Sequence, residues 1–284
     1  LGNRASGAAN LRARWSSSAH AMAANLDGAG VHGSMSTPPR KTVIFGATSA
    51  IAAEVAVLCA RRGDRLYLFG RNPEKMQALL QQLGPSVVGH ECGDLDQCEK
   101  AEARVARAIE CLGGLDRALI AHGYLGDQAR SEREVVYAEQ VLTTNFTSAV
   151  ALLMPLATYC ERQGQGHLAV ITSVAGERGR PRNYTYGAAK RGLSCYLEGL
   201  RSRLYHAGVR VHNIKLGPVD TPMSAGHPQN FLWGEKRAAA RAIVNAMEHR
   251  WHVVYVPRTW ALVMCIVRAL PEFVFQRFAF LAGK

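Results

Sequence analysis

The stretch that decides the fold runs Thr42-Val43-Ile44-Phe45-Gly46-Ala47-Thr48-Ser49-Ala50-Ile51-Ala52. An apolar run rich in β-branched residues, which is typical of a buried strand, ends at Gly46. A short turn follows, and a helical pattern then continues to about Arg62. A strand that turns tightly into a helix brings backbone N–H groups and the positive end of the helix dipole together. The stretch therefore predicts a βα unit whose turn can receive a pyrophosphate.

The same alternation continues along the chain. Further apolar runs predict strands at 65–69, 86–90, 117–121, 168–173, 209–215 and 252–256. Helical patterns lie between them, including one at 96–111 and a long one at about 131–161 that is expected to break near 139–143. The alternation predicts a single Rossmann-like α/β domain at about 41–257. Its core would be a doubly wound, seven-stranded parallel sheet with helices on both faces.

Length and composition fit one such domain. The chain has 284 residues and is 48% hydrophobic, enough to bury a substantial core. Its seven cysteines form an odd set without a Cys-x-x-Cys pair, which favours a reducing, cytoplasmic compartment where thiols act as small apolar residues. The histidines and cysteines show no metal-ligand spacing, so no metal site is expected.

The net charge of +12 suits nucleic acid, an anionic lipid surface or an anionic small molecule as a partner. Basic residues are scattered along the sequence, mostly as arginine, and no nucleic-acid-binding motif interleaves them with aromatic residues. We therefore expect no nucleic-acid partner and interpret the charge as solubility together with attraction to phosphorylated ligands.

The two ends of the chain differ from the predicted domain. Residues 1–40 are rich in Ala, Ser, Gly and Arg without apolar periodicity, and are expected to be disordered. They are either a transit peptide or an extension that precedes a start at Met35. Residues 258–284 predict an amphipathic helical tail, too short and too charged to span a bilayer. This tail either lies at a membrane interface, as a peripheral contact, or packs on the core or a partner subunit.

Tyr186 and Lys190 are separated by one helical turn, which places the phenol and the ammonium on one face of a helix. A nearby cation favours the ionised form of a phenol and so lowers its pKa. A phenol tuned in this way can pass a proton to a carbonyl oxygen. Tyr184 lacks a lysine at the same spacing and is not expected to act. Ser173 ends a predicted buried strand, where open α/β sheets bind ligands.

Asn145, Ser173, Tyr186 and Lys190 have the order and spacing of the catalytic tetrad of the short-chain dehydrogenase/reductase family. The chain resembles this family from about Lys41 to Pro257. The resemblance implies an oxidoreductase acting on CH–OH groups (EC 1.1.1.-). In it Tyr186 is the general acid for ketone reduction, or the base in the reverse direction, and Lys190 lowers the phenol's pKa and binds the nicotinamide ribose. Ser173 hydrogen-bonds the substrate oxygen, and Asn145 holds a water that links Lys190 to solvent.

The resemblance also implies a dinucleotide cofactor. The family's glycine-rich turn is altered, because alanine stands at positions 50 and 52. At the end of the second strand, Gly70 and Arg71 replace the acid of NAD-dependent members, which predicts NADP(H). Asp94 matches an adenine contact, and it also fits a helix N-cap. The expected cofactor contacts are Gly46, Thr48, Ser49, Ala50, Ile51, Arg71, Asp94, Leu95, Ala121, His122, Gly123, Tyr186, Lys190, Val219 and Thr221.

The substrate is less determined. The altered turn, Ala121-His122-Gly123 and the Gly-Glu-Arg-Gly-Arg run at 176–180 resemble reductases that act on decaprenylphosphoryl-2-ketopentose, which implies a lipid-phosphate-linked keto-sugar. Arg178, Arg180 and Arg182 either grip a phosphate or form a solvated loop, and residues 219–234, with Thr221 and Met223, are expected to cover the pocket.

Alternatives to this function stay open. They are a 3-oxoacyl or steroid-type ketone reductase and, in another class, a non-catalytic NADP(H)-binding sensor or scaffold. A homodimer or homotetramer is expected. The C-terminal tail allows peripheral contact with the inner face of a membrane.

Overall fold

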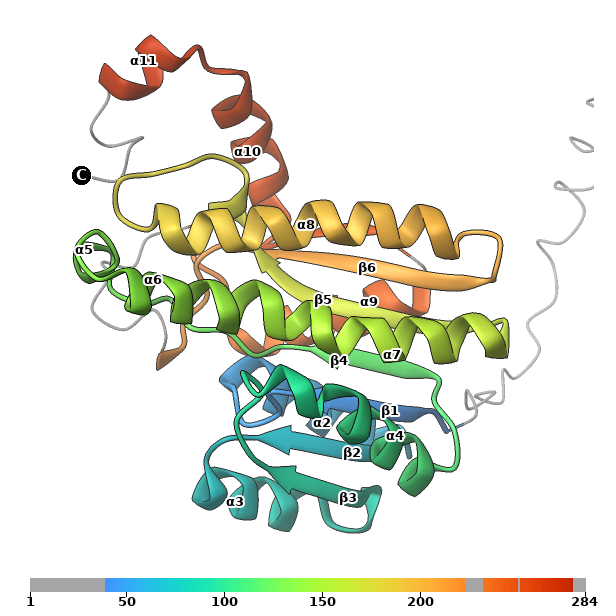
Figure 1. Ribbon diagram of the computed structural model, residues 1–284. Coiled ribbons are helices and arrows are strands. Elements are labelled where there is room, and N and C mark those ends of the chain that lie inside the picture. Colours follow the sequence, from blue (N-terminus) through green and yellow to red (C-terminus); the bar gives the residue numbers. More distant parts are fainter. Residues whose placement is uncertain (1–38, 223–231, 250, 278–284) are drawn as a thin grey trace, which may run out of the picture. The chain divides into compact units, whose positions relative to one another are not determined.

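The computed structural model describes residues 39–222, 232–249 and 251–277, and these form one seven-stranded parallel sheet in the order β3-β2-β1-β4-β5-β6-β7 (Figure 1). This confirms the predicted fold class. The order turns back between β1 and β4, which is where doubly wound sheets bind ligands. The strands are β1 (Lys41–Phe45), β2 (Arg65–Gly70), β3 (Val87–Cys92), β4 (Arg117–Ile120), β5 (Gly166–Ser173), β6 (Val209–Leu216) and β7 (Val253–Val256).

Helices cover both faces of the sheet, each over its own hydrophobic core. On one face pack α2 (Ala50–Arg61), α3 (Pro73–Leu83) and α9 (Lys236–His249). On the other pack α4 (Ala101–Leu112), α7 (Ser148–Gln163) and α8 (Tyr184–Leu204). The strands between them are buried on both sides, which explains why they read as nearly continuous apolar runs.

The helix expected to begin at 96 begins later. A short 3₁₀ turn (η2, Cys98–Lys100) precedes α4, whose first residue is Ala101. Asp94 accepts a hydrogen bond from the backbone N–H of Asp96 at 3.1 Å. The Asp94 side chain thus closes a turn with the backbone two residues further on and does not cap a helix. The N-cap interpretation of Asp94 was therefore wrong.

The long helical segment is interrupted as predicted, but a few residues further on. It comprises α5 (Gln128–Ser131), α6 (Val135–Leu142), a π-helical turn η3 (Thr143–Thr147) and α7. By length and composition, residues 135–163 could cross a membrane, yet half of the most apolar window is buried. Because α7 supplies core residues against the sheet, we assign this helix to the core.

The C-terminal tail is two helices, α10 (Thr259–Ala269) and α11 (Glu272–Arg277), on either side of Pro271. Trp260, Met264 and Phe275 bury their side chains in a small cluster with Val174, the residue after Ser173. The inner face of the tail thus packs on the core, one of the two expected alternatives. Of the expected N-terminal extension only residues 39 and 40 are described, and the backbone N–H of Arg40 donates to Asp64 at 2.9 Å. The rest lies outside the described residues.

Candidate active site

Ser173, Tyr186 and Lys190 meet at the carboxyl edge of the sheet. Ser173 ends β5, and its hydroxyl accepts from the N–H of Ala175 at 3.1 Å and is hydrogen-bonded to the Tyr186 phenol. The Lys190 ammonium donates to the carbonyl of Ile171 at 3.3 Å and lies 5.7 Å from the centroid of the Tyr186 ring. Both Tyr186 and Lys190 are buried. The predicted common face of the helix is therefore confirmed by the contact between them.

Burial, rather than the neighbouring cation, dominates the electrostatics of this group. Removal from water raises the pKa of the Tyr186 phenol to about 12, and the hydrogen bond with Ser173 opposes this only in part. Burial also lowers the pKa of Lys190 to about 8. The expected lowering of the phenol's pKa by Lys190 is therefore outweighed by burial in this structure, where the ammonium faces a backbone carbonyl and the ring. At neutral pH the phenol is held protonated, as a proton donor requires.

Asn145 lies in the π-helical turn, with its side chain buried. Its amide nitrogen donates to the carbonyls of Tyr124 at 2.6 Å and Val141 at 2.9 Å, and its oxygen accepts from the N–H of Tyr124 at 3.1 Å. A Cβ on Gly123 would lie 3.0 Å from this oxygen and 3.4 Å from the Lys190 nitrogen. The turn thus places Asn145 next to Lys190, with a glycine between them.

The turn after β1 keeps its shape despite its alanines. Gly46 has φ +80°, and a Cβ there would lie 2.6 Å from the backbone nitrogen of His122, so glycine is required. Ala50 and Ala52 lie inside α2, in right-handed helical conformation, where alanine is unstrained. The Ser49 side chain caps this helix by accepting from the N–H of Ala52 at 3.4 Å.

The end of β2 has no room for a side chain at Gly70. A Cβ there would lie 2.7 Å from the Thr48 methyl group and 3.0 Å from Met76. The next residue, Arg71, is exposed and close enough to His122 and Asp96 to influence their pKa values. The end of β2 therefore carries a glycine followed by a guanidinium, with no carboxylate at position 70 or 71.

His122 is a neutral structural residue. Burial lowers its pKa to about 3, and its Nε2 lies 2.8 Å from the Ser148 hydroxyl. This lowered pKa favours the uncharged form of the imidazole at neutral pH. Among the other expected contacts, Leu95 is buried in the core and Asp94 is exposed near it.

The base of the expected pocket loop is closed by backbone bonds. Val219 bridges to Gly234, and the N–H of Gly234 donates to the carbonyl of Pro218 at 2.9 Å. Thr221 follows at the start of the loop. The centre of the loop, residues 223–231 with Met223, lies outside the part of the chain that the structure describes.

The three arginines after Ser173 have different surroundings. Arg178 donates to the carbonyls of Val267 at 2.7 Å and Leu270 at 2.6 Å, and it pairs with Glu272 at 2.7 Å. It binds the end of α10 and is not available to grip a phosphate, which corrects that expectation for this residue. Arg180 lies against Met264, and Arg182 is exposed.

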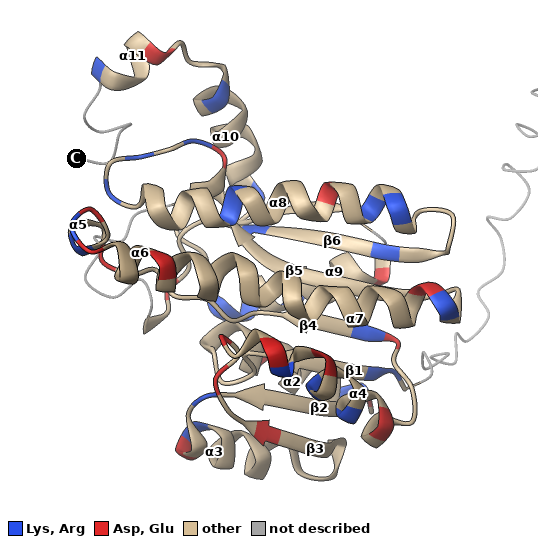
Figure 2. Ribbon diagram, viewed as in Figure 1, with Lys and Arg blue, Asp and Glu red and all other residues tan. Residues whose placement is uncertain are grey.

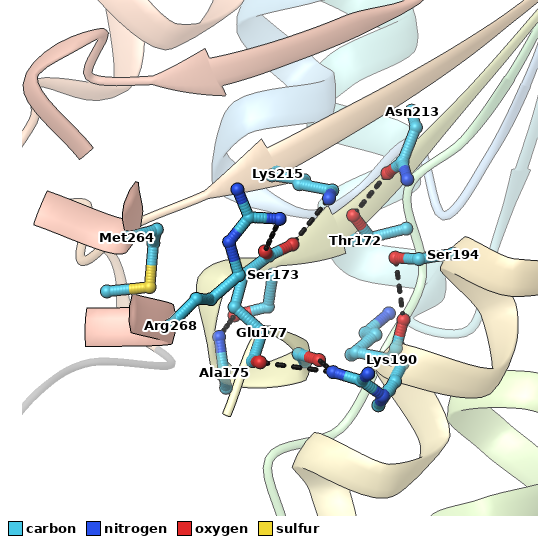
Figure 3. A network of polar contacts seen from close by, with 12 residues as sticks. Thr172, Ser173, Ala175, Glu177, Lys190, Ser194, Asn213, Lys215, Met264 and Arg268 are labelled. Carbon is cyan, nitrogen blue, oxygen red and sulfur yellow. Dashed lines mark hydrogen bonds and ion pairs between the residues drawn. The ribbon is translucent and has the colours of Figure 1, made fainter. Parts of the chain in front are cut away.

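Sequence reasoning missed an ion-pair network beside Ser173 (Figure 3). The buried carboxylate of Glu177 pairs with Lys215 of β6 and, at 3.4 Å, with Arg268 of α10. It therefore links the segment after Ser173 to the sheet and to the C-terminal helices. Lys215 lies within a strand that is buried along most of its length, and a charged side chain at such a position needs a buried partner. This pattern in the sequence could have indicated the ion pair.

Comparisons with known proteins agree on one family. The short chain dehydrogenase family pattern matches residues 40–230. An uncharacterized oxidoreductase of Streptomyces coelicolor is 34% identical over 246 residues, covering 85% of this chain and 97% of the relative. One from Mycobacterium tuberculosis is 35% identical over 240 residues, covering 83% of this chain and 95% of the relative.

Solved structures show the same fold. A short chain dehydrogenase from Burkholderia cenocepacia in complex with NADP has a TM-score of 0.72 at 20% identity, covering 84% of this chain and 97% of that one. Levodione reductase has a TM-score of 0.69 at 23% identity, covering 76% of this chain and 95% of that one.

Proposed function

The chain belongs to the short-chain dehydrogenase family, and from this premise we propose that it reduces a ketone to an alcohol with NADPH, or runs the reverse oxidation. The observation that carries the proposal is the buried Tyr186 phenol, hydrogen-bonded to Ser173 and next to Lys190. A phenol held in this state can donate a proton to a carbonyl oxygen. A protein that only senses the cofactor would have no use for this group.

In the proposed reaction each side chain has one role. The bound cofactor supplies the hydride to the carbonyl carbon. Tyr186 donates its proton to the carbonyl oxygen, and Ser173 donates a hydrogen bond to the same oxygen as negative charge develops. Lys190 stabilises the phenolate left behind. The phenol regains its proton from solvent through Lys190 and a water held at Asn145.

We propose NADP(H) as the cofactor because of the end of β2. Gly70 leaves no space for the carboxylate that would bind a ribose 2′-hydroxyl, and Arg71 offers a cation for a 2′-phosphate. The turn at Gly46 and the N-terminus of α2 suit a pyrophosphate, which backbone N–H groups and the helix dipole can bind. The proposed contacts are Gly46, Thr48, Ser49, Ala50, Ile51, Arg71, Asp94, Leu95, Ala121, His122, Gly123, Tyr186, Lys190, Val219 and Thr221.

We propose a keto-sugar on a lipid phosphate as the substrate. Two features support it: the arginine-containing loop after Ser173, and an apolar outer face on α10, where Leu262 is 69% and Ile266 55% exposed. A 3-oxoacyl or steroid-type ketone is the second candidate. It is supported only by the apolar cluster around Trp260 and Met264. Reduction of neutral ketones in preference to phosphorylated ones would favour it.

We also propose the setting in which the enzyme works. All seven cysteines are free thiols, which fits a reducing, cytoplasmic compartment. The exposed apolar residues Val135, Val136 and Met154 on α6 and α7 fit a subunit interface in a homodimer or homotetramer. The outer face of α10 fits peripheral contact with a membrane.

The first test is a fluorescence titration of the protein with NADPH and with NADH. We expect NADPH to bind more tightly, and Arg71→Ala to weaken it to the level of NADH. Arg162→Ala, which removes an exposed arginine at the end of α7, should change neither affinity. Equal affinities for both nucleotides would contradict the choice of NADPH. If neither nucleotide binds, the proposed reaction is wrong, because it needs the cofactor's hydride.

A further inference from the structure

Arg180 has no charged partner among the residues that the structure describes. It is partly buried in the loop between Ser173 and Tyr186, and its Nε is buried without a hydrogen-bond partner there. Its Nη2 lies 3.8 Å from the Met264 sulfur, a weak acceptor. Burial lowers the pKa of this guanidinium. Arg178, two residues earlier, is bound by two carbonyls and a carboxylate.

An arginine in this state is costly to the fold. A cation withdrawn from water without a carboxylate or carbonyl to replace the lost hydration destabilises the folded state. An apolar side chain at position 180 would pack against Met264 without this cost. The arginine is therefore best explained by a ligand that supplies the missing acceptor.

The surroundings of Arg180 connect it to the candidate active site. Met264 belongs to the cluster that contains Val174, the residue after Ser173, and Trp260. The Trp260 indole donates to the carbonyl of Leu232 at 3.0 Å, near the end of the expected pocket loop. Arg180 thus lies on the segment between Ser173 and Tyr186, against α10, and the cluster it contacts reaches Leu232 through Trp260.

We propose that Arg180 binds an anionic phosphate oxygen of the substrate, as a phosphomonoester or a phosphodiester. A guanidinium is suited to this ligand because its planar donors match two phosphate oxygens at once. The inference rests on the proposed function and deepens it, because it names the protein side chain that would bind the substrate's phosphate, away from the carbonyl that is reduced.

The test uses NADPH-saturated protein, so that added phosphate cannot occupy the cofactor's own phosphate sites. Binding of phenyl phosphate, a monoester, and of monomeric dihexanoylphosphatidylglycerol, a diester, is measured by titration calorimetry. We expect Arg180→Met to weaken binding at least about tenfold, the equivalent of one strong charged contact, and Arg180→Lys to weaken it less. The control Arg162→Met, an exposed arginine at the end of α7, should bind as the wild type does.

The outcomes separate the two proposals. Tighter binding of the diester would indicate a lipid-linked substrate, and tighter binding of the monoester a soluble phosphorylated one. We also expect Arg180→Met to unfold at the same or a higher temperature than the wild type, because it removes an unpaired buried charge. Binding of both probes unaffected by Arg180→Met, or no binding by NADPH-loaded protein, would overturn the inference. Failure of the protein to take up NADPH would instead overturn the proposed function.

Discussion

At the scale of single residues, Tyr186 is distinguished from its neighbour Tyr184 by burial. Tyr184 is 47% exposed, whereas Tyr186 is buried against Ser173. Tyr186→Phe removes the proton donor and leaves the packing intact, so we expect ketone reduction to fall by about 10²–10⁴-fold. NADPH affinity should change little. Tyr184→Phe, measured in the same steady-state assay, should retain activity; equal losses in both variants would assign the role elsewhere.

We expect Lys190 to set the alkaline limit of activity. Its pKa is lowered to about 8 by burial, and the ammonium is the form that stabilises a phenolate. The ammonium is present below this pH and is lost as the pH rises through it, while the phenol remains protonated. We therefore expect kcat/KM for NADPH, which reports the free enzyme, to fall as the pH rises through about 8.

The matching variant is Lys190→Met. Its kcat/KM should be low at every pH and should not show the fall in the alkaline range. Lys75→Met, on the exposed surface of α3, should keep this fall. A wild-type profile that stays flat up to the titration of Tyr186, whose pKa is raised to about 12, would show that Lys190 does not limit the reaction.

Gly70 shows why cofactor choice is not set by one position. Gly70→Asp would place a Cβ 2.7 Å from the Thr48 methyl group. We expect this variant to unfold at a lower temperature and to bind neither nucleotide well. Adding Thr48→Ala removes the closest colliding atoms, leaving the flexible end of Met76 at 3.0 Å, and should recover stability and raise affinity for NADH. Thermal unfolding with each nucleotide measures both effects, and a Gly70→Asp variant as stable as the wild type would refute the steric argument.

Several residues could be predicted from the sequence because local spacing determines them. Tyr186 and Lys190 share a helix, and Ser173 ends a strand whose apolar pattern is plain. Glu177 could not be found in this way, because its partners on β6 and α10 are distant in sequence. The raised pKa of Tyr186 was also hidden, since burial depends on the packing of α6 against α8.

At the scale of elements, sequence periodicity located the strands and most helices, but not their ends. α4 starts late because a 3₁₀ turn intervenes, and the Arg104 side chain donates from α4 back to the carbonyl of Asp94 at 2.8 Å, a contact that spacing alone does not reveal. The sequence likewise predicted a break in the long helical segment but not the exact position of the π-helical turn. It fits one extra residue into a helix, which turns Asn145 toward Tyr124.

The C-terminal helices are attached through Arg178 to the segment that follows Ser173. The Arg178 guanidinium carbon also lies 4.0 Å from the centroid of the Phe275 ring. Arg178→Met removes its hydrogen bonds to the end of α10, and each such charged bond contributes about 1.5–3 kcal/mol. We expect amide exchange in 259–277 to accelerate at least about tenfold. Exchange in the central strands should not change. Arg182→Met is the control, and an unchanged exchange rate in α10 would show that the apolar cluster alone holds the tail.

At the scale of the whole molecule, the described surface carries two separate apolar faces. One lies on α6 and α7, where Figure 2 shows few charges between the ends of α7, and where Val136 is 79% and Met154 58% exposed. The other lies on α10 and α11. α10 contains no acidic residue, its outer face presents Leu262 and Ile266, and the exposed Arg258 immediately precedes it. The first face fits a second copy of the chain, and the second fits an anionic lipid surface.

These assignments can be separated by one pair of variants. Each leucine-sized side chain that leaves water contributes about 1.5–3 kcal/mol, so Leu262→Glu with Ile266→Glu should reduce binding to phosphatidylglycerol vesicles at least about tenfold. The same double variant should keep the wild-type mass in light scattering. Met154→Glu should do the reverse, lowering the mass and leaving vesicle binding intact. If the α10 variant lowers the mass instead, α10 packs against another subunit, and the substrate then reaches Arg180 from solution.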